Sequence, residues 1–274
     1  MKPYSKFTFL SATSTEEKAK VIIIGFPYEL TTSIPGTTFA PNRIREASWL
    51  IEPYSSYQKK SLYNIPISDM GNLMLPPVEI EKVSSSVEKF ISPLISKDKK
   101  LLIIGGDHSI TYFLTKNLPT GIKILQLDAH LDSRNSWRGS SFNHATVMRR
   151  LKEEGREIIH VGIRSVADEE KGIPYFTLKE SLNLLKKKDK AYLSVDIDIF
   201  DPSIAPAVSN PEPGGISFSE FLEWLKNLPP FELVGFDLVE FNPLLEGAHI
   251  TSVLGATVIR EIILKFWSEK EALL

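Results

Sequence analysis

The stretch KILQLDAHLD, residues 123–132, indicates both how the chain folds and where its chemistry lies. Its first half, Lys123–Leu127, is a short apolar run typical of a strand covered on both faces. Its second half carries Asp128, His130 and Asp132 at alternate positions. While the chain stays extended, side chains two residues apart point the same way, so these groups should converge. Carboxylates gathered in this way require a cation between them.

Similar apolar runs recur along the chain and alternate with helical patterns. The expected strands are Val21–Gly25, Lys100–Ile104, Lys123–Leu127, Ile158–Ile163, Ala191–Val195 and Leu233–Leu238. The expected helices are Val78–Ser96, Ala145–Glu154, Leu178–Lys188, Ser219–Asn227 and Ser252–Phe266, the fourth with a capped start at Ser219. This alternation predicts an α/β fold with helices on both sides of a mostly parallel sheet. No interdomain linker is visible, so we expect one domain over residues 1–274.

The composition is that of a globular protein and argues against several functional classes. The 274 residues include 32 basic and 34 acidic side chains, so there is no basic excess for binding nucleic acid. The absence of cysteine excludes disulfides, thiolate metal sites and a cysteine nucleophile. No signal-peptide pattern and no apolar run of membrane-spanning length is present. We therefore expect a cytoplasmic protein that binds neither nucleic acid nor membranes.

Polar segments follow four of the expected strands. They are GGDHS (105–109), DAHLD (128–132), DIDIFDP (196–202) and EFNP (240–243). Because ligands of parallel sheets bind at the carboxyl ends of the strands, these segments should form one site. Taken singly, His108 could cap a helix, Asp128 could belong to a turn, and His160 and His249 could be packing residues. Those interpretations do not explain two strands that both end in carboxylate or imidazole side chains at i, i+2 spacing, with His108 nearby, and the set predicts a metal site.

The ligand chemistry indicates which metal to expect. Oxygen-rich ligands with two imidazoles and no sulfur suit Mn²⁺ or a similar ion better than structural zinc. Six side chains are too many for one ion and suit two ions bridged by carboxylates. The predicted ligands are His108, Asp128, His130, Asp132, Asp196 and Asp198. Four carboxylates balance two divalent ions, and a bridging hydroxide would leave the site slightly anionic, which favours a cationic substrate.

With these motifs, the chain resembles the ureohydrolases, the arginase/agmatinase family of binuclear manganese enzymes. The resemblance rests on GGDHS, DAHLD, SVDIDIFDP (194–202), PEPGG (211–215) and VEFNP (239–243), with weaker matches at 35–45 and 161–165. The motifs span nearly the whole chain in the family order. The resemblance implies a three-layer α/β/α arginase-like fold, two Mn²⁺ per subunit, and a homo-oligomer that is a trimer or a hexamer.

The resemblance also implies a role for each site residue. One manganese would be held by His108, Asp128, Asp132 and Asp196, and the other by His130, Asp128, Asp196 and Asp198. Asp128 and Asp196 would therefore bridge. A hydroxide oriented by Asp132 would attack the guanidinium carbon of a small cationic substrate and release urea. Glu240 matches the carboxylate that grips the guanidinium, and His144, in SFNHATVMRR, matches a histidine that contacts substrate and shuttles protons.

The substrate implied is agmatine or a close guanidino-amine, with urea and putrescine, or the matching polyamine, as products. Arginases carry two carboxylates where this chain has Ser165 and Ala167, and its GIRS and FNHATVMRR segments look like agmatinase. The partner of the distal amine is left open between water, a backbone carbonyl and Glu212. The alternative substrates are N1-aminopropylagmatine, guanidinobutyrate and arginine. A non-catalytic metal-binding protein of the same fold is the alternative outside the enzymes, and a phosphoesterase is disfavoured because no Lys or Arg lies within the ligand motifs.

Overall fold

A seven-stranded sheet forms the centre of the computed structural model, which describes residues 7–30, 34–74 and 80–268. The strand order is β4-β1-β5-β9-β8-β6-β7, and every pair of neighbours is parallel. The strands are β1 (Val21–Phe26), β4 (Ile67–Asn72), β5 (Lys100–Gly105), β6 (Lys123–Leu127), β7 (Ile158–Val161), β8 (Lys190–Asp196) and β9 (Glu232–Val239). A separate antiparallel pair joins β2 (Tyr54–Ser55) to β3 (Lys60–Ser61).

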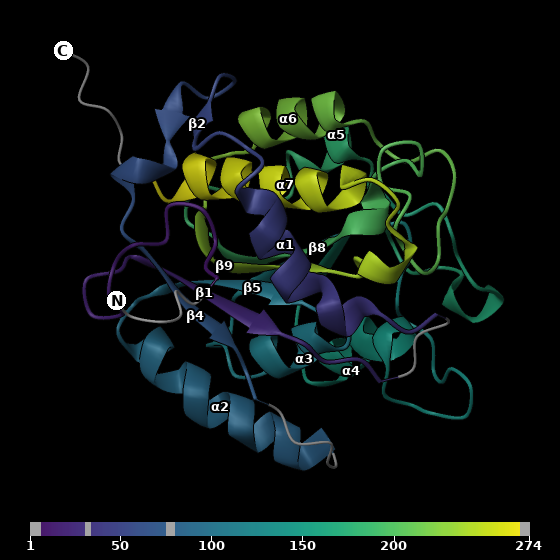
Figure 1. The fold of residues 1–274 in the computed structure, drawn as a ribbon. Coiled ribbons are helices and arrows are strands. Elements are labelled where there is room, and N and C mark those ends of the chain that lie inside the picture. The colour runs from purple at the N-terminus through teal and green to yellow at the C-terminus, as the bar shows by residue number, and fades with distance from the viewer. Residues whose placement is uncertain (1–6, 31–33, 75–79, 269–274) are drawn as a thin grey trace.

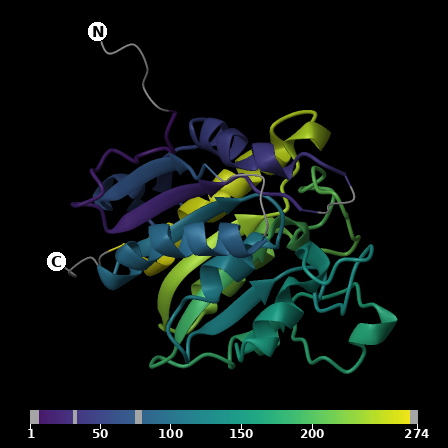
Figure 2. The same ribbon diagram turned by 90° about the horizontal axis from the view of Figure 1, so that it is seen from below.

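Helices cover both faces of this sheet, as Figure 1 shows. The helices are α1 (Ala40–Ser48), α2 (Ile80–Ser96), α3 (Ile110–Thr115), α4 (Val147–Glu153), α5 (Leu178–Ser181), α6 (Phe218–Asn227) and α7 (Ile250–Phe266). Helices α1, α6 and α7 lie over one face, while α2, α3 and α4 lie over the other, the face that Figure 2 views from below. None of the helices in the described part of the chain is long and apolar enough to cross a membrane.

The apolar strands explain this layering. All six residues of β1 are buried, and their side chains alternate between two core clusters. Val21 and Ile23 pack in the cluster that contains α1 and α7, whereas Ile22 and Ile24 pack in the cluster that contains α2 and α3. Such strands need cover on both sides, so the prediction of a three-layer fold with a parallel sheet is confirmed.

The six predicted strands are all present, with small differences at their ends. The strand predicted to reach Ile163 ends at Val161 because Gly162 takes a positive φ of 88° and turns the chain. Strand β4 was not predicted because Ser68, Asp69 and Asn72 interrupt its apolar pattern. It lies at the edge of the sheet, where polar residues are tolerated.

The predicted helices are also present, and α4 and α7 differ from the prediction by one or two residues at their ends. The helix expected over Leu178–Lys188 ends at Ser181. The cap expected at Ser219 is wrong, since Ser217 caps α6 and Glu220 bonds back to the amide of Ser217. Helices α1 and α3 were not predicted, and the expected start of α2 at Val78 lies outside the described residues.

A buried ion pair joins α1 to β4 and gives a stability prediction. Arg45 donates from Nε and Nη2 to the two carboxylate oxygens of Asp69, at 2.7 and 3.0 Å, and its side chain is 2% exposed. An Arg45→Met substitution removes the charge and the paired hydrogen bonds of this buried guanidinium, so we expect it to lower the free energy of unfolding by about 3–5 kcal/mol. Urea unfolding followed by circular dichroism measures this change. A Lys97→Met control removes an exposed pair with Glu16 and should cost no more than about 1 kcal/mol. Equal costs for the two variants would contradict the prediction.

Candidate active site

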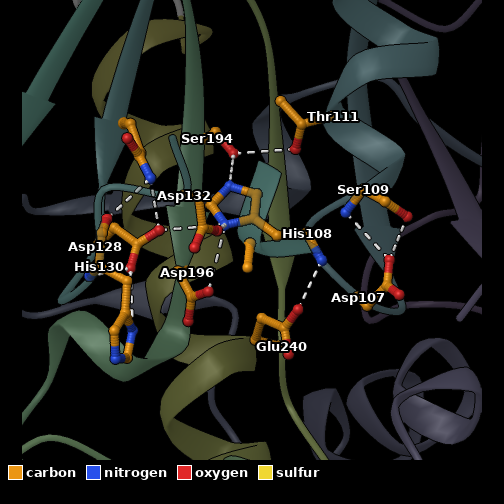
Figure 3. A network of polar contacts seen from close by, with 12 residues as sticks. Asp107, His108, Ser109, Thr111, Asp128, His130, Asp132, Ser194, Asp196 and Glu240 are labelled. Carbon is orange, nitrogen blue, oxygen red and sulfur yellow. Dashed lines mark hydrogen bonds and ion pairs between the residues drawn. The ribbon is translucent and has the colours of Figure 1, made fainter. Parts of the chain in front are cut away.

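The carboxyl ends of β5, β6 and β8 bring the predicted ligands together, and β9, between β5 and β8, places Glu240 beside them. Figure 3 labels Glu240 and five of the six ligands. The turn after β5 is tight, since a Cβ on Gly106 would lie 1.9 Å from the backbone oxygen of Tyr28. Asp107 stabilises the same turn by accepting from the amide of Leu30 and from the amide and hydroxyl of Ser109. The turn therefore directs the His108 ring over the ends of the neighbouring strands.

His108 lies at the centre of the first ligand group. Its Nδ1 is 3.0 Å from Asp132 Oδ2, 3.1 Å from Asp128 Oδ2 and 3.3 Å from Asp196 Oδ2. This buried nitrogen nevertheless makes no well-aligned hydrogen bond to any residue that the structure describes. One donor atom from each of these four buried residues lies within 4.8 Å of the others, which is an arrangement that can hold a metal ion.

The second ligand group consists of Asp128, His130 and Asp198. His130 Nδ1 is 2.9 Å from Asp198 Oδ2 and 3.7 Å from Asp128 Oδ1. Asp128 belongs to both groups, as the predicted bridge requires. Asp196 falls in the first group, so its bridging of the second ion stays a prediction.

The ligands converge by a route that strand alternation does not describe. Strand β6 ends at Leu127, and Asp132 has a left-handed backbone with φ at 50°. Asp198 lies in a 3-10 turn, η5 (Ile197–Ile199), and its amide donates to the carboxylate of Asp196. The predicted convergence is therefore right, but the extended backbone that was its basis is wrong.

The electrostatics of the two groups favour added positive charge. Burial, together with the charges of Asp198 and Asp132, raises the pKa of Asp128 to about 7. Burial also raises the pKa of Asp196 well above its usual value. Burial alone would lower the pKa of His130, but Asp198 and the other carboxylates raise it to about 10. The Nδ1 of His108, which has no hydrogen-bond partner in the described part of the chain, and these crowded oxygens fit two divalent cations of the harder, oxygen-binding kind.

A cavity of about 440 Å³ opens onto four of the six ligands and is also lined by His144 and Glu240. Glu240 follows β9 in a left-handed conformation with φ at 64°, and its Oε1 accepts from the amide of His108 at 2.7 Å. Burial, with the charge of Asp107, raises the pKa of Glu240 well above its usual value. His144 begins the 3-10 helix η3 (His144–Thr146), and its buried Nδ1 has no partner among the described residues. Both residues thus face the site, and their catalytic roles stay predictions.

The outer part of the cavity contains predicted and unpredicted residues. Ser165, Ala167 and Glu212 lie there, as the sequence motifs suggested. Glu170 and Arg134 also line it. The Arg134 guanidinium lies 4.7 Å from the centre of the Trp137 ring, which lines the cavity as well.

The sequence profile of the arginase family matches residues 19–265. The chain belongs to the arginase family. All six predicted ligands lie within the matched range, together with His144 and Glu240. Enzymes of the arginase family depend on a binuclear metal centre, and the buried His/Asp groups of this chain agree with that requirement.

Individual members of the arginase family match along almost the whole chain. The agmatinase of Halalkalibacterium halodurans is 32% identical, covering 95% of this chain and 97% of that protein. Arginase 1, mitochondrial, from Oryza sativa subsp. indica is 33% identical, covering 90% and 82%. The structure of the agmatine ureohydrolase of Thermoplasma volcanium matches with a TM-score of 0.87 at 32% identity, covering 96% and 95% of the two chains. The chain is therefore a ureohydrolase-type hydrolase with the arginase-like fold, and its similar identities to an agmatinase and an arginase do not distinguish between their substrates.

Several residues around this arginase-family site were not predicted from the sequence. Glu170 ends the acidic run Asp168–Glu170, which reads as an exposed turn. In the structure it is buried, and its two oxygens accept from the amides of Ser133 and Ala167. No sequence signal singles it out, because Ala167, three residues earlier, lacks the side-chain acceptor that a capping box requires.

Arg164 connects two parts of the site through backbone contacts. Its guanidinium donates to backbone carbonyls, including those of Asp198 and Glu212. It therefore links the turn that carries a metal ligand to the loop that forms the outer cavity wall.

Metal binding is expected to release protons and to strengthen as pH rises from 6 to 8. In the metal-free cluster the raised pKa values of His130, about 10, and Asp128, about 7, leave both groups largely protonated at pH 6. A metal ion binds the deprotonated forms, so each proton displaced favours binding at higher pH. Calorimetric titration with Mn²⁺ in buffers of different ionisation enthalpy counts the protons. Affinity and proton count that do not change with pH would contradict the prediction.

Proposed function

We propose that this chain is a binuclear manganese amidinohydrolase that converts agmatine, or a close guanidino-amine, to urea and putrescine or the matching polyamine. One observation carries the proposal. The two ligand groups, which share Asp128, open onto the same cavity as Glu240 and His144. The cavity therefore combines ligands for two ions with a buried carboxylate that suits a guanidinium.

The roles proposed for the residues follow from their chemistry. His108, Asp128, His130, Asp132, Asp196 and Asp198 would hold the two Mn²⁺ ions. Bound divalent ions lower the pKa of water and so make a nucleophile available near neutral pH. Glu240 would receive the guanidinium through paired, charge-assisted hydrogen bonds.

Asp132 and His144 would orient the attacking water and transfer its proton. Asp132 would accept a hydrogen bond from the attacking water and so orient it toward the guanidinium carbon. His144, whose Nδ1 accepts and donates no hydrogen bond among the residues that the structure describes, would carry a proton to the departing amine, since imidazole can both donate and accept near neutral pH.

The outer cavity supports a substrate that ends in an amine. Ser165 and Ala167 carry no charge, so an α-amino group would find no carboxylate at those two positions. The carboxylates of Glu170 and Glu212 line the same region and can attract a terminal ammonium group.

Arg134 favours a second candidate substrate within the same reaction class. Its guanidinium lines the cavity beside Trp137 and would attract a carboxylate tail. Guanidinobutyrate carries such a tail. Arginine and N1-aminopropylagmatine complete the set of guanidino compounds to be compared.

The proposal is tested by measuring urea release from Mn²⁺-loaded protein with agmatine, N1-aminopropylagmatine, guanidinobutyrate and arginine in separate samples. We expect urea from agmatine or its aminopropyl derivative. Urea mainly from guanidinobutyrate would indicate that Arg134 binds the carboxylate tail of the substrate. Urea mainly from arginine would contradict the significance given to Ser165 and Ala167. No urea from any compound, with two ions bound per chain, would exclude the substrate class but not the metal centre.

We further propose a single domain, a cytoplasmic location and a trimer or hexamer. The arginase-family match over residues 19–265 supports the single domain. The oligomer follows from the resemblance to ureohydrolases, and light scattering of the purified protein measures its size.

A further inference from the structure

A row of buried polar side chains crosses the sheet next to the metal ligands. His160 on β7 is in register with Gln126 on β6, Gln126 with Ser194 on β8, and Ser194 with Asp237 on β9. Each of the four is at most 4% exposed. Neighbours in register share one face of a sheet, and the ligands Asp128 and Asp196 follow Gln126 and Ser194 by two residues. The row thus lies directly beneath the ligands.

The row contacts the ligands at two points. On β8, Ser194 Oγ is 2.9 Å from His108 Nε2 and donates to Asp237. On β6, Gln126 Nε2 donates to Asp128 Oδ2 at 2.6 Å and to the backbone oxygen of His130 at 3.2 Å.

The contacts of Gln126 determine which ring nitrogen of His160 carries the proton. Two oxygen acceptors face one end of the amide, so this end must be the NH₂ group. The amide oxygen therefore faces His160 Nδ1, 2.5 Å away, and this nitrogen must be the donor. Burial lowers the pKa of His160 to about 4, so the ring is neutral at neutral pH and its single proton lies on Nδ1.

This arrangement orients the carboxylate that both ligand groups share. Asp128 Oδ1 accepts from the amide of His130 at 2.6 Å, and Oδ2 accepts from Gln126. Each oxygen has a second lone pair, so one hydrogen bond on each side fixes the carboxylate plane and leaves both oxygens able to bind an ion. Without the His160 proton, the oxygen of the Gln126 amide loses its hydrogen bond, and the NH₂ group is held less firmly against Asp128.

We propose that His160 and Gln126 are positioning residues for the metal centre. His160 holds the amide of Gln126, which in turn holds Asp128 in the orientation that serves both ions. The inference rests on the proposed metal centre and extends it to a second layer of residues on the edge strand β7. Outer partners of this kind adjust the geometry and basicity of metal ligands.

Two substitutions at His160 separate positioning from packing. His160→Asn keeps an N–H donor near the position of Nδ1, while His160→Leu fills the space without a donor. The readout is the affinity of the metal-free protein for Mn²⁺, from equilibrium dialysis with the bound metal counted by atomic absorption. We expect His160→Leu to bind Mn²⁺ roughly 10- to 100-fold more weakly than the wild type, and His160→Asn to bind within about threefold of it.

Gln126→Glu is the second test and does not depend on the His160 variants folding. It is nearly isosteric, keeps an acceptor for His160 and places an oxygen against Asp128 Oδ2, so we expect at least the loss seen in His160→Leu. Leu125→Val is the matched control, because Leu125 lies on β6 with its side chain in the core on the opposite face. It should lower the melting temperature slightly and leave Mn²⁺ affinity unchanged.

The outcomes test the metal centre and the positioning role of His160 and Gln126 separately. A wild-type protein that binds no Mn²⁺ would overturn the metal centre and this inference with it. A wild type that binds two ions, with His160→Leu or Gln126→Glu binding equally well, would overturn only the positioning role. His160→Asn as weak as His160→Leu would also overturn it, since the donor would then have no effect.

Discussion

An Asp128→Asn variant is expected to bind neither divalent ion firmly and to release no measurable urea. Asp128 is the residue shared by the two ligand groups, so its loss weakens both positions at once. Its two oxygens accept from the amide of His130 and from Gln126, so the NH₂ group of asparagine would face a donor in either orientation. The loss of activity should therefore exceed the roughly 10- to 100-fold that loss of an outer partner costs.

Metal content after dialysis and urea release with agmatine measure the two effects of Asp128→Asn. Asp98→Asn is the matched control, because it removes one carboxylate charge from an exposed position before the start of β5, away from the ligands. Retention of two ions per chain in Asp128→Asn would contradict the shared-ligand interpretation. Asp196→Asn adds a comparison, since loss of both ions there would support the second predicted bridge and loss of one would argue against it.

The central sheet could be predicted because its strands are buried on both faces. Their apolar runs, such as Val21–Gly25 and Lys123–Leu127, differ clearly from the surrounding sequence. Strand β4 carries Asp69, which pairs with Arg45 on α1, and the sequence alone does not reveal this ion pair. Helix α3 was missed because its six residues are too few to display a helical period.

The ligands could be predicted because they follow strands, and parallel strands end at one edge of a sheet. Their surroundings could not. Gln126 and His160 lie 34 residues apart and meet only through the register of β6 with β7. Glu170 looks like part of an exposed acidic run until the loop folds over its side chain. Contacts of this kind depend on which strands are neighbours and on the paths of the loops. A local sequence pattern does not reveal either of them.

A Glu240→Gln variant is expected to keep its metals and lose most of its turnover. Glu240 belongs to neither ligand group, so two Mn²⁺ ions should still bind. Its Oε1 accepts from the amide of His108 at 2.7 Å, and a glutamine oxygen can keep that bond. The NH₂ group of the glutamine then faces the cavity, where it opposes the N–H groups of a guanidinium. Removing the charge of one partner in a buried, hydrogen-bonded charge pair costs about 2–5 kcal/mol.

At about 1.4 kcal/mol for each tenfold change, this cost corresponds to a fall of roughly 30- to 4000-fold in kcat/KM. Urea release with agmatine measures the fall, and atomic absorption on the same sample confirms that the metals remain. Glu232→Gln is the matched control, because it makes the same change at the opposite end of β9, where the side chain pairs with Lys100 and Lys190. It should leave kcat/KM unchanged. Near-normal turnover by Glu240→Gln would show that the guanidinium binds elsewhere in the cavity, whereas loss of the metals would show that Glu240 supports the ligands through His108 and not the substrate.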